Sequence, residues 1–469
     1  MKSTFLNLIA VLCVVFLFST CKNDHDHLDQ AVRQEIKIPV NMDDGTFVSL
    51  QQATKVAKAF SGKQSTLRSS NTQERIVSTE TIKGKDNNPS MYVINYAGGG
   101  WVIVGSSRNY YPILAYSNEN SFVLDENMGS MMIWLDETKE AIRTSGALLD
   151  SVKLAMRSDW NRFEEDGFQM PESSNLRSSN PALDAYTARM NYVCQTYPSQ
   201  GYNTFPPLSG AASYIGPNYN SLLQKATSCG ANPNYSIVMV KKEYITYPVG
   251  PLLATQWEQE SPFNYYCNGY PAGCVTISLA QIMKFHKYPT NYNWDNMPNI
   301  KSKYIAPYTN YSTPSFIYEL GNNLGLNYTT GNVSANDNQI KQALTKYGYS
   351  YTLKNSNVDD VINEVATNKR PVSMGGFTSQ GEGHQWVCDG TETYQYITKY
   401  FVELQIGNSY SVTYSWCGSA SNPLFYVTQT GTHLHMNWGF GGRNDGWFTY
   451  DAVNTIYQSG RTNFYIKPK

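Results

Sequence analysis

The sequence predicts an α+β protein in which an N-terminal unit of helices and strands precedes a larger domain built from a cysteine-bearing helix and an antiparallel sheet. Two stretches support this prediction. In residues 271–286, Gly273 allows a sharp turn, and apolar residues then recur at i, i+4, i+7 and i+8, the spacing of a buried helix face. From Pro371 onward, apolar and polar residues alternate between turn formers, which indicates strands. The recurring apolar residues of the helix are Val275, Leu279, Ile282 and Met283.

Cys274 lies at the junction between this turn and the helix. Unpaired backbone N–H groups and the positive end of the helix dipole meet there and stabilise a thiolate, so the pKa of the thiol should be lowered. The same N–H groups can bind the oxyanion that forms when a thiolate attacks a carbonyl. Free cysteine is also common as a small buried residue, so this stretch alone leaves a structural role open.

Two later motifs supply partners for a reactive thiol. Glycines precede His384 and an apolar alternation follows it, so this histidine should begin a strand. Its pKa suits it to take a thiol proton and return it to a leaving amine. Asn437 could fix the tautomer of His384, and Trp438 could shield the pair from water. His433 and His435 are alternative bases, but neither has a glycine-rich approach for a substrate backbone.

Residues 40–150 form a separate unit that shows no set of nucleophile, acid or metal ligands, so its role is folding or inhibition. Its pattern predicts a helix over 47–60 capped by Ser49, a hairpin over 91–105, a strand over 113–116 and a helix over 133–154. A polar linker follows over 157–181. Residues 182–248 have no clear assignment and either begin the second domain or cover it.

A repeated string offers one hint about processing. Leu-Arg-Ser-Ser-Asn occurs at 67–71 and again at 176–180. The two copies are candidate processing sites in exposed loops, and a chance repeat is the alternative.

The N-terminus predicts export. A 14-residue apolar run over 5–18 follows Lys2 and is too short to span a bilayer comfortably, but it suits a signal peptide. The ending Phe18–Cys21 resembles the lipobox of bacterial lipoproteins, which would make Cys21 the lipidated residue, although Thr20 is an imperfect match. The charged residues 22–26 are similar to the tags that direct lipoproteins to the surface of Bacteroides-like bacteria. A plain secretory signal is the alternative.

Composition excludes several other functions. The 36 Lys and Arg residues balance 37 Asp and Glu residues, and no long basic run is present, so nucleic acid is not an expected partner. The sequence contains no CxxC motif or His-rich cluster, and we expect neither a metal nor a cofactor. Six cysteines lie outside the export segment, and any pairing among them stays open: Cys194, Cys229, Cys267, Cys274, Cys388 and Cys417.

These motifs together resemble the streptopain family of papain-clan cysteine peptidases over residues 251–469. The resemblance is carried by residues 272–275, 280–286, 292–294, 383–384, 389–390, 437–442 and 445–446. It implies a papain-like catalytic domain in which Cys274 is the nucleophile, His384 the general base and acid, and Asn437 with Trp438 the orienting pair. It also implies that Gly383, Gln256 and Ser334, the last in the loop over 328–335, bind substrate.

The resemblance further implies a division of the chain. Residues 1–21 would be the signal peptide, 22–180 an inhibitory prodomain and 181–469 the peptidase domain. For residues 181–250, linker or prodomain is the alternative. Residues 391–432 form an insertion that shorter family members lack. The expected partners are protein or peptide substrates and the chain's own prodomain, and the membrane is reached only through a lipid anchor. The protein would be exported, as an outer-membrane or cell-surface lipoprotein or in secreted form.

Two alternative functions remain. An acyl transferase of transglutaminase or amidase type uses the same Cys-His chemistry, because an amine can resolve an acyl-enzyme in place of water. An inactive surface lipoprotein that binds peptide or glycan is the second, but the presence of Cys274, His384 and Asn437 together argues against it. For a peptidase, we expect apolar or aromatic side chains two residues before the cleaved bond. The nearest acids, Asp337 and Glu382, lie among polar loop residues and do not suggest a pocket for Arg or Lys.

Overall fold

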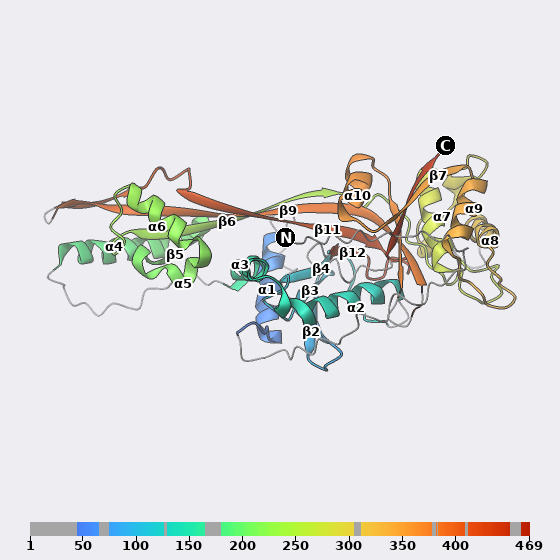
Figure 1. The fold of residues 1–469 in the computed structure, drawn as a ribbon, viewed down its shortest axis with the longest axis horizontal. Coiled ribbons are helices and arrows are strands. Elements are labelled where there is room, and N and C mark those ends of the chain that lie inside the picture. Colours follow the sequence, from blue (N-terminus) through green and yellow to red (C-terminus); the bar gives the residue numbers. More distant parts are fainter. Residues whose placement is uncertain are drawn as a thin grey trace, which may run out of the picture. The chain divides into compact units, whose positions relative to one another are not determined.

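Within the part of the chain that the computed structural model describes, thirteen strands form one sheet in which each pairing is antiparallel. The main path runs β1-β2-β3-β4-β12-β11-β9-β8-β13-β7. The described residues are 45–64, 75–125, 129–164, 180–303, 311–377, 381, 383–408, 411–450 and 461–469. They all belong to the unit Val40–Lys469. Helices accompany the sheet throughout, so the predicted α+β class is confirmed (Figure 1).

Residues 45–164 are here called the N-terminal unit, and their described part forms three α-helices and the first four strands. These are α1 (Leu50–Gln64), β1 (Ile76–Lys83), β2 (Pro89–Tyr96), β3 (Trp101–Gly105), β4 (Ile113–Ser117), α2 (Gly129–Thr144) and α3 (Asp150–Glu164). The predicted Ser49 cap is confirmed, since Gln52 N donates to Ser49 Oγ and Ser49 N donates to Gln52 Oε1. The predicted hairpin is also confirmed as β2 and β3.

The prediction of one helix over 133–154 is wrong, because the structure divides this segment between α2 and α3. A short turn, Ser145–Ala147, separates them. Ser145 Oγ donates to Ile142 O, a local bond that competes with helical pairing, and Gly146 follows with low helix propensity.

The C-terminal half carries the cysteine-bearing helix and most of the sheet. Its elements are α7 (Cys274–His286), α8 (Ser312–Asn323), α9 (Asp337–Lys346), β7 (Tyr349–Asn355), α10 (Val358–Ile362), β8 (Val372–Phe377), β9 (Gly383–Asn408), β11 (Phe425–Asn437), β12 (Gly446–Thr449) and β13 (Thr462–Pro468). The predicted helix at Cys274 is confirmed, and residues 275–283 of it are buried. Ser278 Oγ fixes α7 to the sheet, because it lies 2.8 Å from Ser373 Oγ of β8 and donates to Trp386 O of β9.

The segment that the sequence left unassigned pairs with the insertion. It contains α4 (Pro181–Thr196), β5 (Tyr202–Pro207), α5 (Ala212–Ile215), α6 (Tyr219–Ser228) and β6 (Ile237–Val249). Strand β6 pairs with β9 from Val249 opposite Thr391 to Ile237 opposite Glu403, β11 pairs with β9 on its other side, and β10 (Ser411–Trp416) folds back on the end of β9. A disulfide joins Cys229 to Cys417. We call residues 180–249 and 391–432 the insertion module.

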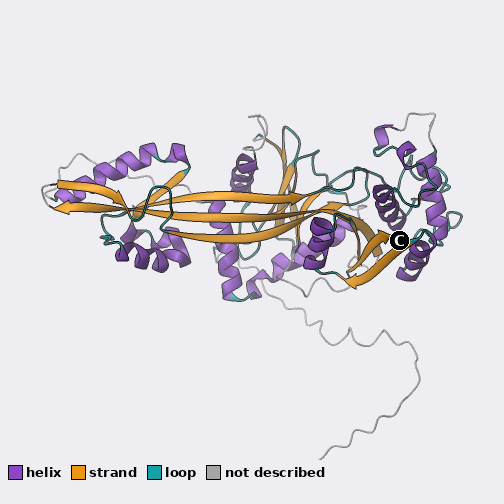
Figure 2. Cartoon of the chain, turned by 90° about the horizontal axis from the view of Figure 1, so that it is seen from above, coloured by secondary structure: helices purple, strands orange, loops and turns teal. Residues whose placement is uncertain are grey.

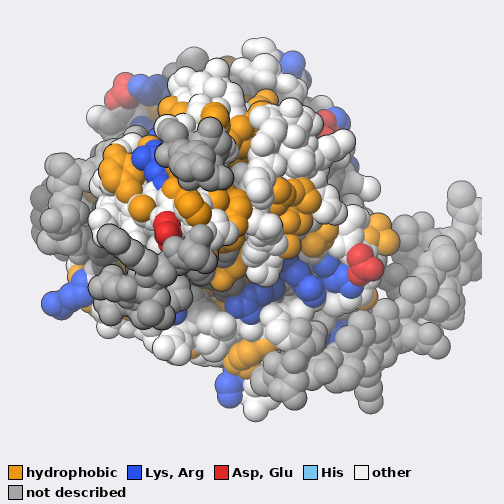
Figure 3. Space-filling view, turned by 90° about the vertical axis from the view of Figure 1, so that its left-hand side faces the viewer, with side chains coloured by type: hydrophobic (Ala, Val, Ile, Leu, Met, Phe, Trp, Pro, Cys, Tyr) orange, Lys and Arg blue, Asp and Glu red, His pale blue; other side chains and the backbone are white. Residues whose placement is uncertain are grey.

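The insertion module has its own apolar clusters, which lie between its helices and the long strands. Figures 1 and 2 show β6, β9 and β11 side by side, with α4, α5 and α6 around one end of them and α7, α8 and α9 beyond the other end. Figure 3 views the end with α4 to α6, where hydrophobic side chains gather beside Lys and Arg. Exposed hydrophobic residues on these elements include Leu183, Tyr192, Tyr214 and Ile406. None of the helices in the described ranges is long and apolar enough to cross a membrane.

Candidate active site

The turn before helix α7 requires a glycine at position 273, and this turn sets Cys274 at the start of the helix. Gly273 has φ of 91°, in the left-handed region. A Cβ at this position would lie 2.8 Å from Val333 O and from Leu326 Cδ2. The loop over 328–335 therefore lies directly against the turn that delivers Cys274 to the helix N-terminus.

The Cys274 thiol is free and only partly exposed. Burial raises its pKa, while hydrogen bonds from the backbone of Gln385, of Val275 and of Cys274 itself lower it by less. The predicted lowering of the thiol pKa is therefore wrong for this structure, because the desolvation of the sulfur outweighs the helix N-terminus. The contact with Gln385 brings the sulfur next to the residue that follows His384.

His384 lies near the start of β9, as its glycine-rich approach predicts, and pairs with Gly376 of β8. Its ring lies against Gly129, the first residue of α2 in the N-terminal unit. A Cβ on Gly129 would be 2.0 Å from His384 Nε2 and 2.1 Å from His384 Cε1. The N-terminal unit thus occupies one side of the imidazole, and the absence of a side chain at Gly129 is what allows that approach.

Asn437 ends β11 and links three parts of the domain. Its Oδ1 accepts from Gln281 Nε2 of α7 at 3.0 Å and from Gly439 N at 3.2 Å, and its Nδ2 donates to Thr255 O at 2.9 Å. A bond from Asn437 to His384 is not among those that the amide makes with described residues. Asn437 is 4% exposed, so this network lies in the interior, where each bond is costly to lose.

Trp438 follows Asn437 and is buried. Its ring lies 5.6 Å from the ring of Trp386, two residues after His384, and 5.0 Å from that of Phe448. Its backbone N–H donates to Asp445 Oδ1 at 2.9 Å. The indole therefore packs beside the strand that carries His384, in the cluster that also contains α2 of the N-terminal unit.

The predicted substrate-binding residues are spread over three elements. Ser334 is exposed and donates to Asn332 Oδ1 at 3.1 Å, in the loop that touches Gly273. Gly383 is exposed and pairs with Phe377. Gln256 pairs through its backbone with Asn299, and its side chain fills the space beside Gly442. The next residue, Trp257, donates its backbone N–H to Gln281 Oε1, and Gln281 is seven residues beyond Cys274, about 10 Å further along α7.

A second glutamine, Gln259, was missed from the sequence and lies beside the turn before Cys274. Gln259 O accepts the N–H of Ala272 at 2.8 Å, two residues before Cys274. The chain at Gln259 therefore runs alongside the turn that positions the sulfur. No spacing rule distinguishes Gln259 from Gln256, because the loop between them and Cys274 is irregular.

The alternative bases His433 and His435 are both engaged with carboxylates. His435 Nδ1 lies 2.7 Å from Asp389 Oδ1. Burial is the largest single influence and lowers the pKa of His435, but the charge and hydrogen bond of Asp389 together with the charges of Asp445 and Glu119 raise that pKa on balance. His433 Nδ1 lies 3.4 Å from Glu392 Oε2. Asp389 is the extra residue of a bulge in the pairing of β9 with β11, and bulges re-aim side chains beside functional sites. These pairs were missed because spacing along a strand does not reveal a bulge.

Family models match both halves of the chain. A model described as Spi protease inhibitor matches residues 45–142, and one described as the Peptidase C10 family matches residues 257–292 and 290–448. Streptopain from Streptococcus pyogenes is 22% identical over 385 residues, which cover 80% of this chain and 77% of the relative. Streptopain from S. pyogenes serotype M1 matches to the same extent. A solved fragment of Prevotella intermedia prointerpain A covers 83% of this chain and 98% of its own, at 14% identity and a TM-score of 0.42.

An inhibitor-type unit followed by a peptidase-type domain defines a protease zymogen, that is, a precursor that carries its own inhibitor. The chain is a cysteine endopeptidase that is similar to streptopain and to the Peptidase C10 family, and its N-terminal unit is an inhibitor-like prodomain.

We predict that Asn437→Ala destabilises the domain. The change leaves Gln281 Nε2 and Thr255 O buried without their described partner, and each unsatisfied group costs about 1–3 kcal/mol. The free energy of unfolding, measured by chemical denaturation in a Cys274→Ala background to prevent self-digestion, should fall by about 2–4 kcal/mol. An unchanged unfolding midpoint would contradict the linking role of this amide.

Proposed function

We propose that Cys274 and His384 hydrolyse peptide bonds in protein substrates. The observation that carries this proposal is the packing of the start of α7 on the strand that bears His384: Ser278 Oγ, one turn beyond Cys274, donates to Trp386 O, two residues beyond His384. The backbone of Gln385, which lowers the pKa of Cys274, supports the same placement. In the reaction, His384 takes the thiol proton and the sulfur attacks the carbonyl carbon. His384 then gives the proton to the leaving amine, and water hydrolyses the acyl-enzyme. Asn437 bonds to Gln281 of α7, and Trp438 packs on Trp386 of β9, so these two residues help to hold the two elements that bear Cys274 and His384.

The oxyanion formed in each step needs donors near the sulfur. The N–H groups at the start of α7 are one source. Gln259 is the second donor that we propose, because its backbone bond to Ala272 holds it beside the turn before Cys274. Gln256 remains a candidate substrate-binding residue, but its neighbour Trp257 lies level with Gln281, further along α7.

Latency follows from the position of the prodomain. Helix α2 lies against His384 through Gly129 and is held there by several bonds to the peptidase domain. Trp134 Nε1 donates to Thr449 O at 3.1 Å, and Arg461 Nε donates to Glu137 Oε1 at 3.0 Å. Asn444 exchanges two bonds with the backbone of Val123. A substrate that approached His384 from the α2 side would have to displace this helix.

The site of maturation follows from the strand pairing. Strand β6 forms a continuous ladder with β9 through all of Ile237–Val249. Cleavage within residues 165–180 would therefore leave the insertion module on the mature enzyme, whereas a segment cut after β6 would stay paired with β9 and disulfide-bonded to Cys417, so that cut would not release it. We propose the earlier site and keep residues 22–180 as the prodomain.

Export is the remaining part of the proposal. The Cys229–Cys417 disulfide links segments 188 residues apart and supports an oxidising compartment. The signal peptide over 1–21 and lipidation at Cys21 lie outside the described residues and stay predictions. Substrate preference also stays a prediction: Asp337 begins α9 as an exposed residue, which fits the expectation of apolar or aromatic side chains two residues before the cleaved bond.

We predict that Cys274→Ala and His384→Ala each reduce hydrolysis of a short chromogenic peptide by at least about 10³-fold, because nucleophile and base act as a unit. Cys194→Ala is the matched control, since Cys194 is a partly exposed cysteine of the insertion module that is not in the disulfide. Both active-site variants should keep the wild-type unfolding midpoint. Turnover close to wild type in either of them would end the assignment.

We predict that Gln259→Ala lowers kcat about 10²- to 10³-fold with a small effect on KM, as loss of an oxyanion donor does. Gln256→Ala provides the comparison, because both changes remove one amide from the same loop. We expect Gln256→Ala to change kcat much less. The reverse ranking would assign the oxyanion donor to Gln256.

We predict that Gly129→Ala weakens latency. The added methyl group overlaps the His384 ring, and such overpacking costs about 1–3 kcal/mol. The form of the precursor in which α2 has moved away from His384 should therefore become roughly 5- to 100-fold more populated. The measurement is the initial rate of peptide hydrolysis by uncut precursor. Gly146→Ala is the control, because a Cβ there meets nothing within 4 Å. Equal initial rates in the two variants would show that α2 does not control access to His384.

A further inference from the structure

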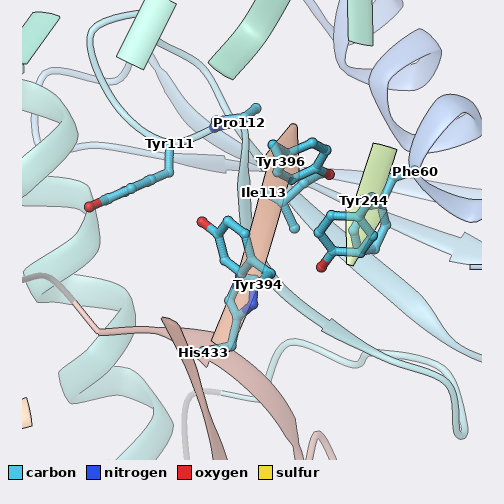
Figure 4. Close-up of a pocket in the computed structure, with 8 residues that line it drawn as sticks. All are labelled: Phe60, Tyr111, Pro112, Ile113, Tyr244, Tyr394, Tyr396 and His433. Atoms are coloured by element: carbon cyan, nitrogen blue, oxygen red, sulfur yellow. The ribbon is translucent and has the colours of Figure 1, made fainter. Parts of the chain in front are cut away.

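The insertion module presents an aromatic face to the prodomain. On β9, Glu392, Tyr394 and Tyr396 point to the same side, and Tyr244 of β6 and His433 of β11 lie opposite Tyr396 and Glu392 in the neighbouring strands. We call these five residues the ribbon face. Figure 4 shows Tyr244, Tyr394, Tyr396 and His433 around a small pocket. Prodomain residues Phe60, Tyr111, Pro112 and Ile113 line the same pocket.

The prodomain covers this face with rings and one hydrogen bond. The Tyr116 hydroxyl of β4 donates to Glu392 Oε2. The Tyr116 ring stands edge-on to His433 at 5.4 Å, and Phe163 of α3 stands edge-on to Tyr396 at 6.1 Å. Glu392 is 5% exposed, so its carboxylate depends on these contacts for the polar partners that burial requires.

The ribbon face lies on the opposite side of the sheet from His384. Trp386 and Cys388 share a cluster with α2, whereas Tyr394 and Tyr396 share one with α1 and α3. The bulge at Asp389 explains the change, because one extra residue reverses the alternation of side chains along β9. Glu392 is eight residues beyond His384, which corresponds to about 26 Å along the strand.

The contact between the prodomain and the ribbon face has the features of an interface that can open rather than those of a permanent core. The two sides leave a pocket between them. His433 is 2% exposed, and neither of its ring nitrogens makes a hydrogen bond with a described residue, although Nδ1 lies 3.4 Å from Glu392 Oε2. Such a group is costly in a permanent interior but becomes satisfied by water once the cover leaves. Interfaces between units that move apart also tend to be polar, as Glu392 and His433 make this one.

We propose that the ribbon face is a second binding surface for the prodomain, remote from the catalytic residues, that retains the prodomain on the enzyme after the linker has been cut. The proposal deepens the latency described above and rests on it. The prodomain contacts both faces of the sheet: α2 packs on the face that bears His384, and α1, α3 and Tyr116 pack on the ribbon face. Cutting the chain therefore does not activate the enzyme until both contacts open.

The test compares two tyrosine hydroxyls of the prodomain. Tyr116→Phe removes the bond to Glu392 and keeps the ring, and Tyr92→Phe removes a buried bond to Val48 O that lies entirely inside the prodomain. Both precursors carry a recognition site for an added site-specific protease within residues 165–179. After cleavage, hydrolysis of a short peptide is followed during serial dilution, which yields the dissociation constant of the cut prodomain.

The expected result is that wild type and Tyr92→Phe remain latent after the cut, while Tyr116→Phe releases its prodomain with a dissociation constant roughly 5- to 100-fold higher. Equal dissociation constants for the two variants, or full activity of the wild type as soon as the linker is cut, would overturn the proposal.

A second pair changes the enzyme side. Tyr394→Thr with Tyr396→Thr removes two rings from the ribbon face, and Gln395→Thr with Ile397→Thr changes the opposite face of the same strand. Only the first pair should weaken retention, and both fully processed enzymes should hydrolyse the short peptide as the wild type does, which shows that they fold. Equal weakening by both pairs would overturn the proposal. Failure of the catalytic assignment has a different signature, namely peptide hydrolysis by Cys274→Ala.

Discussion

The hydrogen-bond ladder along β9 is the constraint on which the rest of the structure depends. Its first residues pair with β8 and set His384 opposite Gly376, and the remainder pairs with β11 on one side and β6 on the other. Because side chains alternate along a strand, a slip of one residue would turn His384 and the tyrosines of the ribbon face away from their partners together. One strand therefore fixes both the candidate active site and the surface that the prodomain covers.

The prodomain uses this sheet by extending it. Tyr116 and Ala115 of β4 pair with Trp447 and Phe448 of β12, so the four strands of the prodomain continue the sheet of the peptidase. Side chains of the joined sheet then face helices on both sides, with α2 in one cluster and α1 and α3 in the other. An inhibitor bound in this way needs few contacts at the thiol itself, because the shared sheet holds the whole unit in register.

The sequence was informative where structure is local. The period of the residues after Gly273 predicted α7, and the glycines before His384 predicted the start of β9, because each pattern depends on neighbours along the chain. The pairing of β6 with β9 joins segments about 150 residues apart, and their alternation does not name a partner. The contact of Gly129 with His384 could not be predicted either, since a glycine in a helical segment does not indicate which residue packs against it. The candidate active site was thus predictable as residue types in order, and its present geometry was not.

The thiol pKa shows why geometry mattered for chemistry. The helix N-terminus and the backbone of Gln385 favour a thiolate at Cys274, as residue types alone suggest, but burial opposes them and prevails. The hydrogen bond from Gln385 belongs to the same stretch of β9 as His384, so it persists as long as β9 keeps its pairing with β8. Any rearrangement that brings water to the sulfur would remove part of the desolvation and leave that bond in place, and the thiol pKa would then fall. Departure of α2 from His384 would open the side of β9 that bears this histidine, so a substrate could reach the proposed base from that side.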